Sequence, residues 1–245
     1  RLLGGAFGLG LFGNVTEAYR FLALNYSPGR PGEPGDEIYV LGFSRGAYTA
    51  RSLVGMIGRV GLLTSEALIA NKLPEAVDRY RRARPTAGDF GSSDEEFKRD
   101  HCHNPKVRFL GVFDTVGALG VPGALANRHK FHDVRLSPAV SCARQALAID
   151  ERRLKFEPSL WEDDGAGGQN DRVKQVWFEG AHSDVGGGYG ETGLSDTSLL
   201  WMVREANGQG LVFNEGLLDS YIGSGSSAVR HDSMNNGYRF LNLIA

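Results

Sequence analysis

The sequence predicts an α/β fold in which helices cover both faces of a parallel sheet. Three short apolar runs, rich in residues that favour strands, lie at residues 37–43, 107–113 and 173–178. Segments with helical spacing of apolar residues separate these runs, and strands that alternate with helices in this way form parallel sheets. Three strands are few for an independent α/β domain, so we expect that N-terminal strands preceding Arg1 are missing.

The composition is that of a globular protein with one core. The chain has 245 residues, of which 41% are hydrophobic and 23% charged, and its formal net charge is −2. This balance argues against a protein that binds nucleic acid by neutralising phosphates. The sequence shows neither an apolar stretch of membrane-spanning length nor a signal peptide. We therefore expect a single domain over residues 1–245, an N-terminally truncated fragment, located in the cytoplasm.

Capping residues and apolar periodicity predict helices between the strands. Asn14 and Glu17 have the spacing of a capping box, and the apolar residues after them recur on one helical face. Ser137 followed by Pro138 suits a helix start, since proline is favoured in the first turn. The residues at 27–36, rich in proline and glycine, predict a loop. The expected helices cover residues 14–26, 45–58, 65–84 with a break at Pro74, a short segment from Ser93, 138–149 and 196–206.

A serine motif follows the first predicted strand. Residues 42–46 read GFSRG and match G-x-S-x-G, in which a serine lies on a sharp turn between a strand and a helix. The motif is weak alone because the chain holds 34 glycines, but here a strand precedes it and a helix of small residues follows. Glycine at positions 42 and 46 is expected to avoid a clash where the chain reverses. Ser44 is therefore the candidate nucleophile, and its alternative role is to cap the helix.

A serine hydroxyl needs a base to take its proton, and the base needs an orienting carboxylate. Asp114 directly follows the second predicted strand, and His182 lies four residues past the third. The carboxyl ends of parallel strands meet at one edge of a sheet, so both side chains are expected beside Ser44. Two alternatives remain open, in which Asp114 caps the next segment and His182 bonds to local backbone. Asp184 competes for the role of the acid, and His231 for that of the base.

Neither a metal nor a cofactor is expected. His101 and His103 flank Cys102, but adjacent residues rarely converge on one ion. The glycines at residues 186–190 lack the lysine and the serine or threonine of a phosphate-binding loop, which disfavours nucleotide binding. A disulfide between Cys102 and Cys142 does not follow from their spacing.

Three blocks of the sequence carry a family resemblance. They are residues 42–51 (GFSRGAYTAR), 109–117 (FLGVFDTVG) and 180–189 (GAHSDVGGGY), with further likeness at residues 4–21, 136–161 (which include ALAIDERR) and 173–178. These blocks resemble the catalytic domain of type VI secretion phospholipase effectors (Tle-type), which many uncharacterised bacterial and fungal hydrolases share. The resemblance extends over most of the chain, to about Trp201, and it implies an α/β-hydrolase fold, with Ser44 as nucleophile, Asp114 as acid and His182 as base.

The resemblance also implies an activity and a departure from the family pattern. The activity is hydrolysis of lipid or phospholipid esters through an acyl-enzyme, with the backbone N–H of Arg45 as one donor of the oxyanion hole. Family members carry an earlier strand and an Asp-Gly-Thr block that this sequence lacks, and the second donor normally comes from that region. The Arg45 side chain is suited either to steer an anionic head group or to form an ion pair with a neighbouring loop.

Expected partners follow from the same resemblance. They are a lipid or phospholipid ester substrate, a membrane surface contacted peripherally, and a secretion or immunity protein, with delivery by a secretion system that needs no signal peptide. The alternative to a serine esterase is a non-catalytic hydrolase-like module that binds a partner or ligand.

Overall fold

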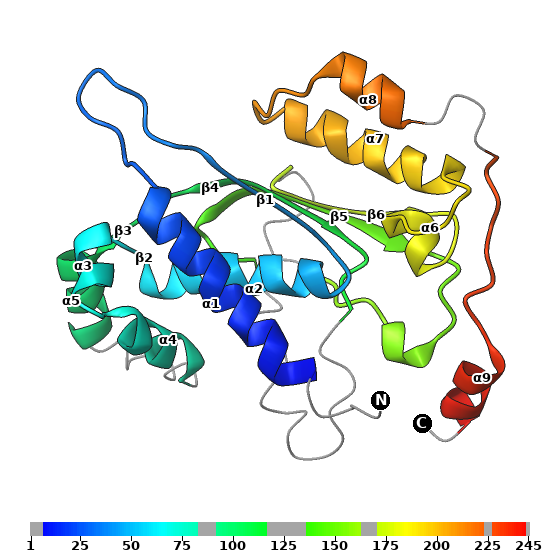
Figure 1. The fold of residues 1–245 in the computed structure, drawn as a ribbon, viewed down its shortest axis with the longest axis horizontal. Helices are drawn as coiled ribbons and strands as arrows, with labels where there is room; N and C mark the ends of the chain where they lie inside the picture. Colours follow the sequence, from blue (N-terminus) through cyan, green and yellow to red (C-terminus); the bar gives the residue numbers. More distant parts are fainter. Residues whose placement is uncertain (1–6, 83–91, 117–135, 163–170, 223–226, 244–245) are drawn as a thin grey trace.

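Four parallel strands form the central sheet of the computed structural model, in the order β1-β4-β5-β6 (Figure 1). The structure describes residues 7–82, 92–116, 136–162, 171–222 and 227–243. The strands are β1 (Ile38–Phe43), β4 (Val107–Phe113), β5 (Val140–Ala148) and β6 (Val173–Phe178). All three neighbouring pairs are parallel, so the carboxyl ends of the strands share one edge of the sheet.

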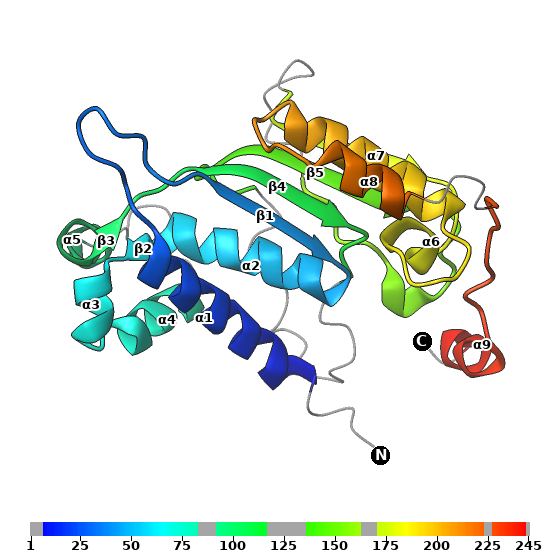
Figure 2. The same cartoon turned by 45° about the horizontal axis from the view of Figure 1, so that its top comes forward.

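Helices cover both faces of this sheet, which confirms the predicted α/β fold. One face is covered by α1 (Phe7–Asn25) and α2 (Arg45–Val60), and the other by α7 (Gly193–Asn207), with α8 (Glu215–Tyr221) alongside α7 (Figure 2). The short helix α6 (His182–Gly186) lies at the carboxyl edge and packs on α7 and β5. None of the helices in the described ranges combines the length and apolar character that a bilayer crossing requires.

A smaller group of elements lies beside the sheet at the end of α2. Its two-stranded antiparallel sheet pairs β2 (Leu62–Leu63) with β3 (Cys102–His103). Around it lie α3 (Ser65–Ile69), α4 (Leu73–Arg81) and α5 (Ser92–His101). Pro74 falls in the first turn of α4, so the predicted break at this proline is confirmed. The remaining elements are a 3-10 turn (Leu154–Phe156) and α9 (Asn236–Leu243).

The core has separate parts on the two faces of the sheet. On the α1–α2 face, α2 buries apolar residues that include Ala47, Ala50, Leu53, Val54 and Ile57. The Tyr19 hydroxyl is also buried there, where it donates to Gly61 O and accepts from Leu63 N, as a buried phenol requires. On the α7 face, Phe109 and Cys142 pack against Met202 and Ala206. Both cysteines are free thiols.

The predicted helix at residues 138–149 is wrong, because these residues form the central strand β5. Eight of its nine residues are buried, since β4 and β6 flank it and helices cover both faces. Ser137 accepts from Ala139 N in a turn and does not begin a helix. A short apolar run that is buried on every side has no period that separates strand from helix.

The remaining predictions differ from the structure mainly at element ends. The strand at residues 107–113 is confirmed to the residue, and so is the one at 173–178. The capping box at Asn14 is wrong, because α1 already includes Phe7 and Asn14 lies within it. The helix expected at residues 196–206 begins three residues earlier, at Gly193, and ends one residue later, at Asn207.

Candidate active site

Ser44 lies on the tight turn between β1 and α2, in a backbone conformation that few side chains adopt. Its φ is 56° and its ψ is −118°, which is a strained combination for a residue other than glycine. Its N–H donates to Phe113 O, at 3.0 Å, and so fixes the turn to the end of β4. Its side chain makes no capping hydrogen bond to α2, so the alternative role as a helix cap does not describe this serine.

The two glycines of the motif are not equivalent. A Cβ on Gly42 would lie 2.4 Å from Gly46 O, so the turn excludes any side chain at position 42. A Cβ on Gly46 would meet nothing within 4 Å. The expectation that both positions avoid a clash is therefore confirmed at Gly42 and wrong at Gly46, since only Gly42 faces the opposing backbone of the reversal.

Asp114 begins the loop after β4 and connects β5 to α6. Its Oδ1 accepts from Ala148 N at 3.0 Å, and its Oδ2 lies 2.7 Å from His182 Nδ1. The residue is only 1% exposed and has a φ of 38°, a second strained backbone at this edge. Asp114 therefore does not cap the next segment. It holds the imidazole of His182, and that bond favours the tautomer with hydrogen on Nδ1.

His182 is the first residue of α6, and its ring is enclosed by two phenylalanines. The Phe43 ring lies 4.6 Å from the imidazole centroid, and the Phe156 ring meets it edge-on at 5.0 Å. Phe43 immediately precedes Ser44. Gly186 permits this arrangement, because a Cβ there would lie 2.0 Å from the Phe43 ring. The structure thus brings the imidazole against Asp114 and beside the turn that carries Ser44.

The two competing candidates bond to each other. Asp184 Oδ1 lies 2.6 Å from His231 Nδ1, while Asp184 Oδ2 accepts from Ala181 N and His231 N. His231 Nε2 faces Glu191 Oε2 at 3.4 Å, and Tyr189 stacks on the ring at 3.8 Å between centroids. The hydrogen bond that His231 donates to Asp184, aided by Glu191, raises the pKa of His231. This second pair fastens the C-terminal segment to α6.

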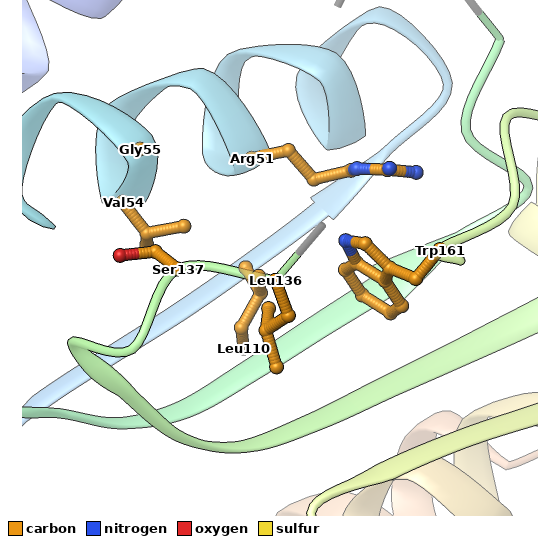
Figure 3. Close-up of a pocket in the computed structure, with 7 residues that line it drawn as sticks. All are labelled: Arg51, Val54, Gly55, Leu110, Leu136, Ser137 and Trp161. Atoms are coloured by element: carbon orange, nitrogen blue, oxygen red, sulfur yellow. The ribbon is translucent and has the colours of Figure 1, made fainter. Parts of the chain in front are cut away.

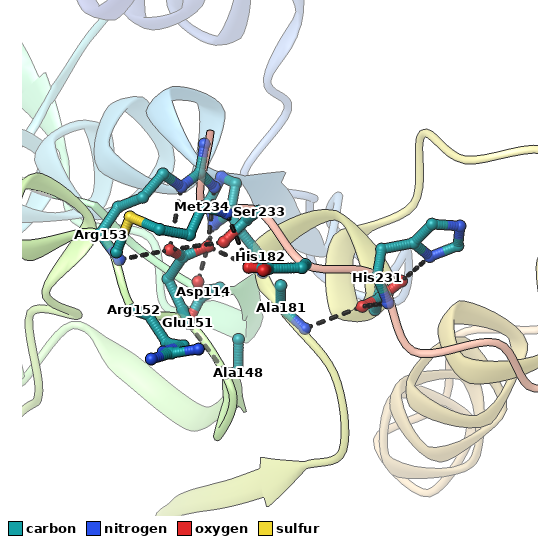
Figure 4. A network of polar contacts seen from close by, with 12 residues as sticks. Asp114, Ala148, Glu151, Arg152, Arg153, Ala181, His182, His231, Ser233 and Met234 are labelled. Carbon is teal, nitrogen blue, oxygen red and sulfur yellow. Dashed lines mark hydrogen bonds and ion pairs between the residues drawn. The ribbon is translucent and has the colours of Figure 1, made fainter. Parts of the chain in front are cut away.

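Sequence reasoning missed two residues that contact this site, Glu151 and Arg153. The Glu151 carboxylate accepts from His182 N at 3.3 Å and from Arg153 Nη2 at 2.7 Å (Figure 4). The sequence did hold a signal, because polar residues that follow a strand at the carboxyl edge are expected at a site. The signal is hidden because the sequence predicts a helix for β5, the strand that precedes Glu151 and Arg153.

A small pocket lies elsewhere, between α2 and the sheet. Its lining residues are Arg51, Val54, Gly55, Leu110, Leu136, Ser137 and Trp161 (Figure 3). The Arg51 guanidinium lies over the Trp161 ring at 4.6 Å and donates to Ser159 O. These contacts join α2 to the segment after β5, and we assign the pocket to packing.

The histidines near Cys102 take part in aromatic packing. His101 meets the Phe97 ring edge-on at 5.2 Å, and His103 lies 5.6 Å from the Tyr26 ring. Within the described ranges, histidine, cysteine and acidic side chains do not gather in groups of three or more that could hold a metal ion.

Comparisons with known proteins add relatives of this chain. A sequence relative is an uncharacterized protein of Saccharomyces cerevisiae, 36% identical over 163 residues. That match covers 64% of this chain and 22% of the yeast protein, so the chain spans about a fifth of the length of this curated relative.

Two solved structures are also similar. A crystal structure of an uncharacterized protein from Pseudomonas aeruginosa has 19% identity and a TM-score of 0.43, over 90% of this chain and 30% of that one. A structure of the Tle1 effector bound to the VgrG spike of the type 6 secretion system has 24% identity and a TM-score of 0.33, over 72% and 29% respectively.

A family model identifies the protein family to which the chain belongs. It is described as the catalytic domain of the Tle1-like phospholipase effectors of the type VI secretion system, and it matches residues 1–205. The matched range includes Ser44, Asp114 and His182 and ends before His231. The chain therefore belongs to the Tle1-like phospholipase effector catalytic domain family.

Proposed function

We propose that this chain is the catalytic domain of a serine hydrolase that cleaves carboxylic ester bonds of lipids or phospholipids through Ser44, His182 and Asp114. The observation that carries the proposal is the buried 2.7 Å bond between Asp114 and His182 beside the strained turn of Ser44. Membership of a phospholipase effector family supports the lipid substrate. We further propose that residues 1–245 belong to one catalytic domain.

In the first half of the reaction, Ser44 Oγ attacks the ester carbonyl carbon while His182 Nε2 takes the hydroxyl proton. Asp114 stabilises the imidazolium through its bond to Nδ1 and keeps its own negative charge. When the tetrahedral intermediate collapses, the bond to the alcohol oxygen breaks and the imidazolium returns the proton to that oxygen. The lysolipid or glycerol product leaves, and the acyl group stays on Ser44.

In the second half, water takes the place of the alcohol. His182 removes a proton from the water as its oxygen attacks the acyl carbon, and the proton then passes to Ser44 Oγ as the acyl bond breaks. The products are a fatty acid and the restored hydroxyl. The Arg45 N–H, at the start of α2, donates to the oxyanion in both halves, where one such donor is worth about 10²- to 10³-fold in rate.

We extend the proposal to partners in two steps. The Arg45 side chain is exposed next to the nucleophile, and a guanidinium suits the phosphate of a phospholipid head group. One structural neighbour is a Tle1 effector bound to a VgrG spike, and we propose a secretion-system protein of that kind as a partner of the whole protein.

The test is covalent labelling of the protein, expressed at full length, with a fluorophosphonate that reacts only with an activated serine. We expect labelling on Ser44, and we expect Ser44→Ala to abolish both labelling and hydrolysis of a short acyl ester. Ser52→Ala, on the same helix α2, is the matched control and should behave as the parent protein. An unlabelled parent protein would instead favour a non-catalytic module that binds a partner.

A further inference from the structure

Glu151 is a buried acidic residue that the catalytic steps above do not use. It lies three residues past the end of β5, between the strands whose carboxyl ends carry Asp114 and His182. Its side chain is only 3% exposed. A carboxylate is costly to bury unless its charge is paired and its oxygens accept hydrogen bonds, so its surroundings need to supply both.

Three residues supply these partners (Figure 4). Arg153 donates from its backbone N at 2.8 Å, from Nε at 2.9 Å and from Nη2 at 2.7 Å. Ser233 Oγ donates at 3.0 Å from the C-terminal segment. The backbone N–H of His182 donates to Oε2 at 3.3 Å. Glu151 therefore connects a fixed cation, the C-terminal segment and the main chain of the proposed base.

The charge of Glu151 is constant over the working pH range. Burial acts to raise its pKa, but the hydrogen bonds from Arg153, together with its charge and the bond from Ser233, lower the pKa to about 2. The carboxylate is thus ionised at neutral pH. It has no proton to give, which suits a fixed acceptor and excludes a role as general acid.

The turn that carries His182 requires such an anchor. Gly180 has a φ of 104°, which is open to glycine and strained for other residues, and α6 is only five residues long. Asp150 accepts from Gly180 N at 2.8 Å, and Glu151 accepts from His182 N two residues later. Adjacent acidic residues therefore tie both ends of the turn to the chain after β5.

A second contact reaches the imidazole ring itself. The Arg153 guanidinium lies 3.5 Å from the centroid of the Phe156 ring, a cation–π contact. Phe156 in turn meets the His182 ring edge-on. The pair of Glu151 and Arg153 thus supports His182 at its main chain and, through Phe156, at its side chain.

We propose that Glu151, held by Arg153, is the positioning residue that keeps His182 in place to take the proton of Ser44. The proposal rests on the function proposed above. An error of about 1 Å in the position of a catalytic group can cost on the order of 10²-fold in rate, so a small loss of support at His182 is enough to slow the reaction.

The variant Glu151→Gln keeps the shape and removes the charge. We expect kcat for a short acyl ester, and the rate of fluorophosphonate labelling, to fall about 10- to 100-fold, with KM nearly unchanged. Arg153→Lys keeps the charge but loses the planar fork, so it should show a smaller loss of the same kind.

The matched control is Glu205→Gln. Glu205 on α7 accepts from Arg144 Nε and, at 3.0 Å, from Lys174 Nζ, so this variant also breaks a part-buried ion pair, nearer the start of β5 and β6. Its thermal stability should fall while its kcat, KM and labelling rate stay those of the parent protein.

The outcomes separate this inference from the proposed function. A parent protein that does not label at Ser44 overturns the function, and the inference with it. If the parent protein labels, and the Glu151→Gln and Arg153→Lys variants match Glu205→Gln in kcat, KM and labelling rate, the positioning role alone is overturned. If Glu151→Gln does not fold, Arg153→Lys decides by the same comparison.

Discussion

The Asp114–His182 pair and the Asp184–His231 pair have the same chemistry and nearly the same distance from carboxylate oxygen to Nδ1, 2.7 Å and 2.6 Å. Their surroundings differ. His182 has one carboxylate, at Nδ1, and phenylalanine rings around the imidazole. His231 has a carboxylate at each ring nitrogen and a side chain that is 22% exposed.

This difference decides which histidine suits catalysis. Two carboxylates favour the charged imidazolium, and accordingly the pKa of His231 is raised. An imidazolium has no lone pair to accept a proton, so His231 is a poor base where it stays charged. Within the described residues the His182 imidazole is hydrogen-bonded at Nδ1 only, and it lies beside the only described strand-to-helix turn with a strained serine. The bond to aspartate is therefore not sufficient to identify a base, and the environment of the second nitrogen is what separates the pairs.

The largest expected effect comes from removing each imidazole in turn. His182→Ala should lower kcat for a short acyl ester by roughly 10⁵-fold or more, the scale on which loss of the base abolishes activation of a serine. His231→Ala, the matched change in the other pair, should stay within about tenfold of the parent, because positioning effects are smaller than loss of the base. Steady-state rates of the two variants decide the comparison. Equal losses would contradict the assignment of different roles.

A second, smaller effect concerns the turn that places Ser44 beside the first pair. Gly42→Ala puts a methyl group against Gly46 O, so the turn has to shift, and we expect a loss of about 10²-fold in kcat. Gly46→Ala enters open space and should change kcat less than about twofold, because alanine is well tolerated in a helix. The contrast is measured by kinetics on both variants, with circular dichroism to compare folding. A harmless Gly42→Ala would show that the turn adapts.

The Asp114–His182 pair could be predicted from the sequence, whereas the pairing of Asp184 with His231 could not. The end of a strand is encoded locally, so Ser44 and Asp114 are recognised where apolar runs stop. His182 follows a third run in the same way. Nothing local shows that Asp184 and His231 meet, because 47 residues separate them and the contact depends on the path of the C-terminal segment.

The strand β5 shows a second limit of prediction from local sequence, because it was mistaken for a helix. Its residues carry no period of two, because a central strand is buried on both faces and needs apolar or small residues throughout. Its alanines also favour a helix on local propensity, and tertiary packing overrides that preference. Mistaking this strand for a helix concealed Glu151 and Arg153, since residues after a helix are not expected at the carboxyl edge of a sheet.

The smallest expected effect is that the attachment of the C-terminal segment by the Asp184–His231 pair depends on pH. The folded-state pKa of His231 is raised, so the attachment it provides is complete below the ordinary pKa of histidine and is lost as the pH rises through the folded value. The groups that face His231 are the carboxyl groups of Asp184 and Glu191 and the phenol of Tyr189, whose pKa is raised by burial. His231 is therefore the group whose raised pKa makes this attachment depend on pH.

The expected result is a C-terminal segment that opens more readily at pH 9 than at pH 6. Amide hydrogen exchange at residues 229–234, corrected for the intrinsic dependence on pH, should be roughly two- to fivefold less protected at pH 9, the range of an exposed ion pair. His231→Gln removes the titration and should show the same corrected protection at both values. If the parent protein also showed equal corrected protection at both pH values, the role of His231 in holding the C-terminal segment would be contradicted. A parent protein whose esterase rate follows the same transition would show that this segment also acts on His182, through the Ser233 hydroxyl on Glu151.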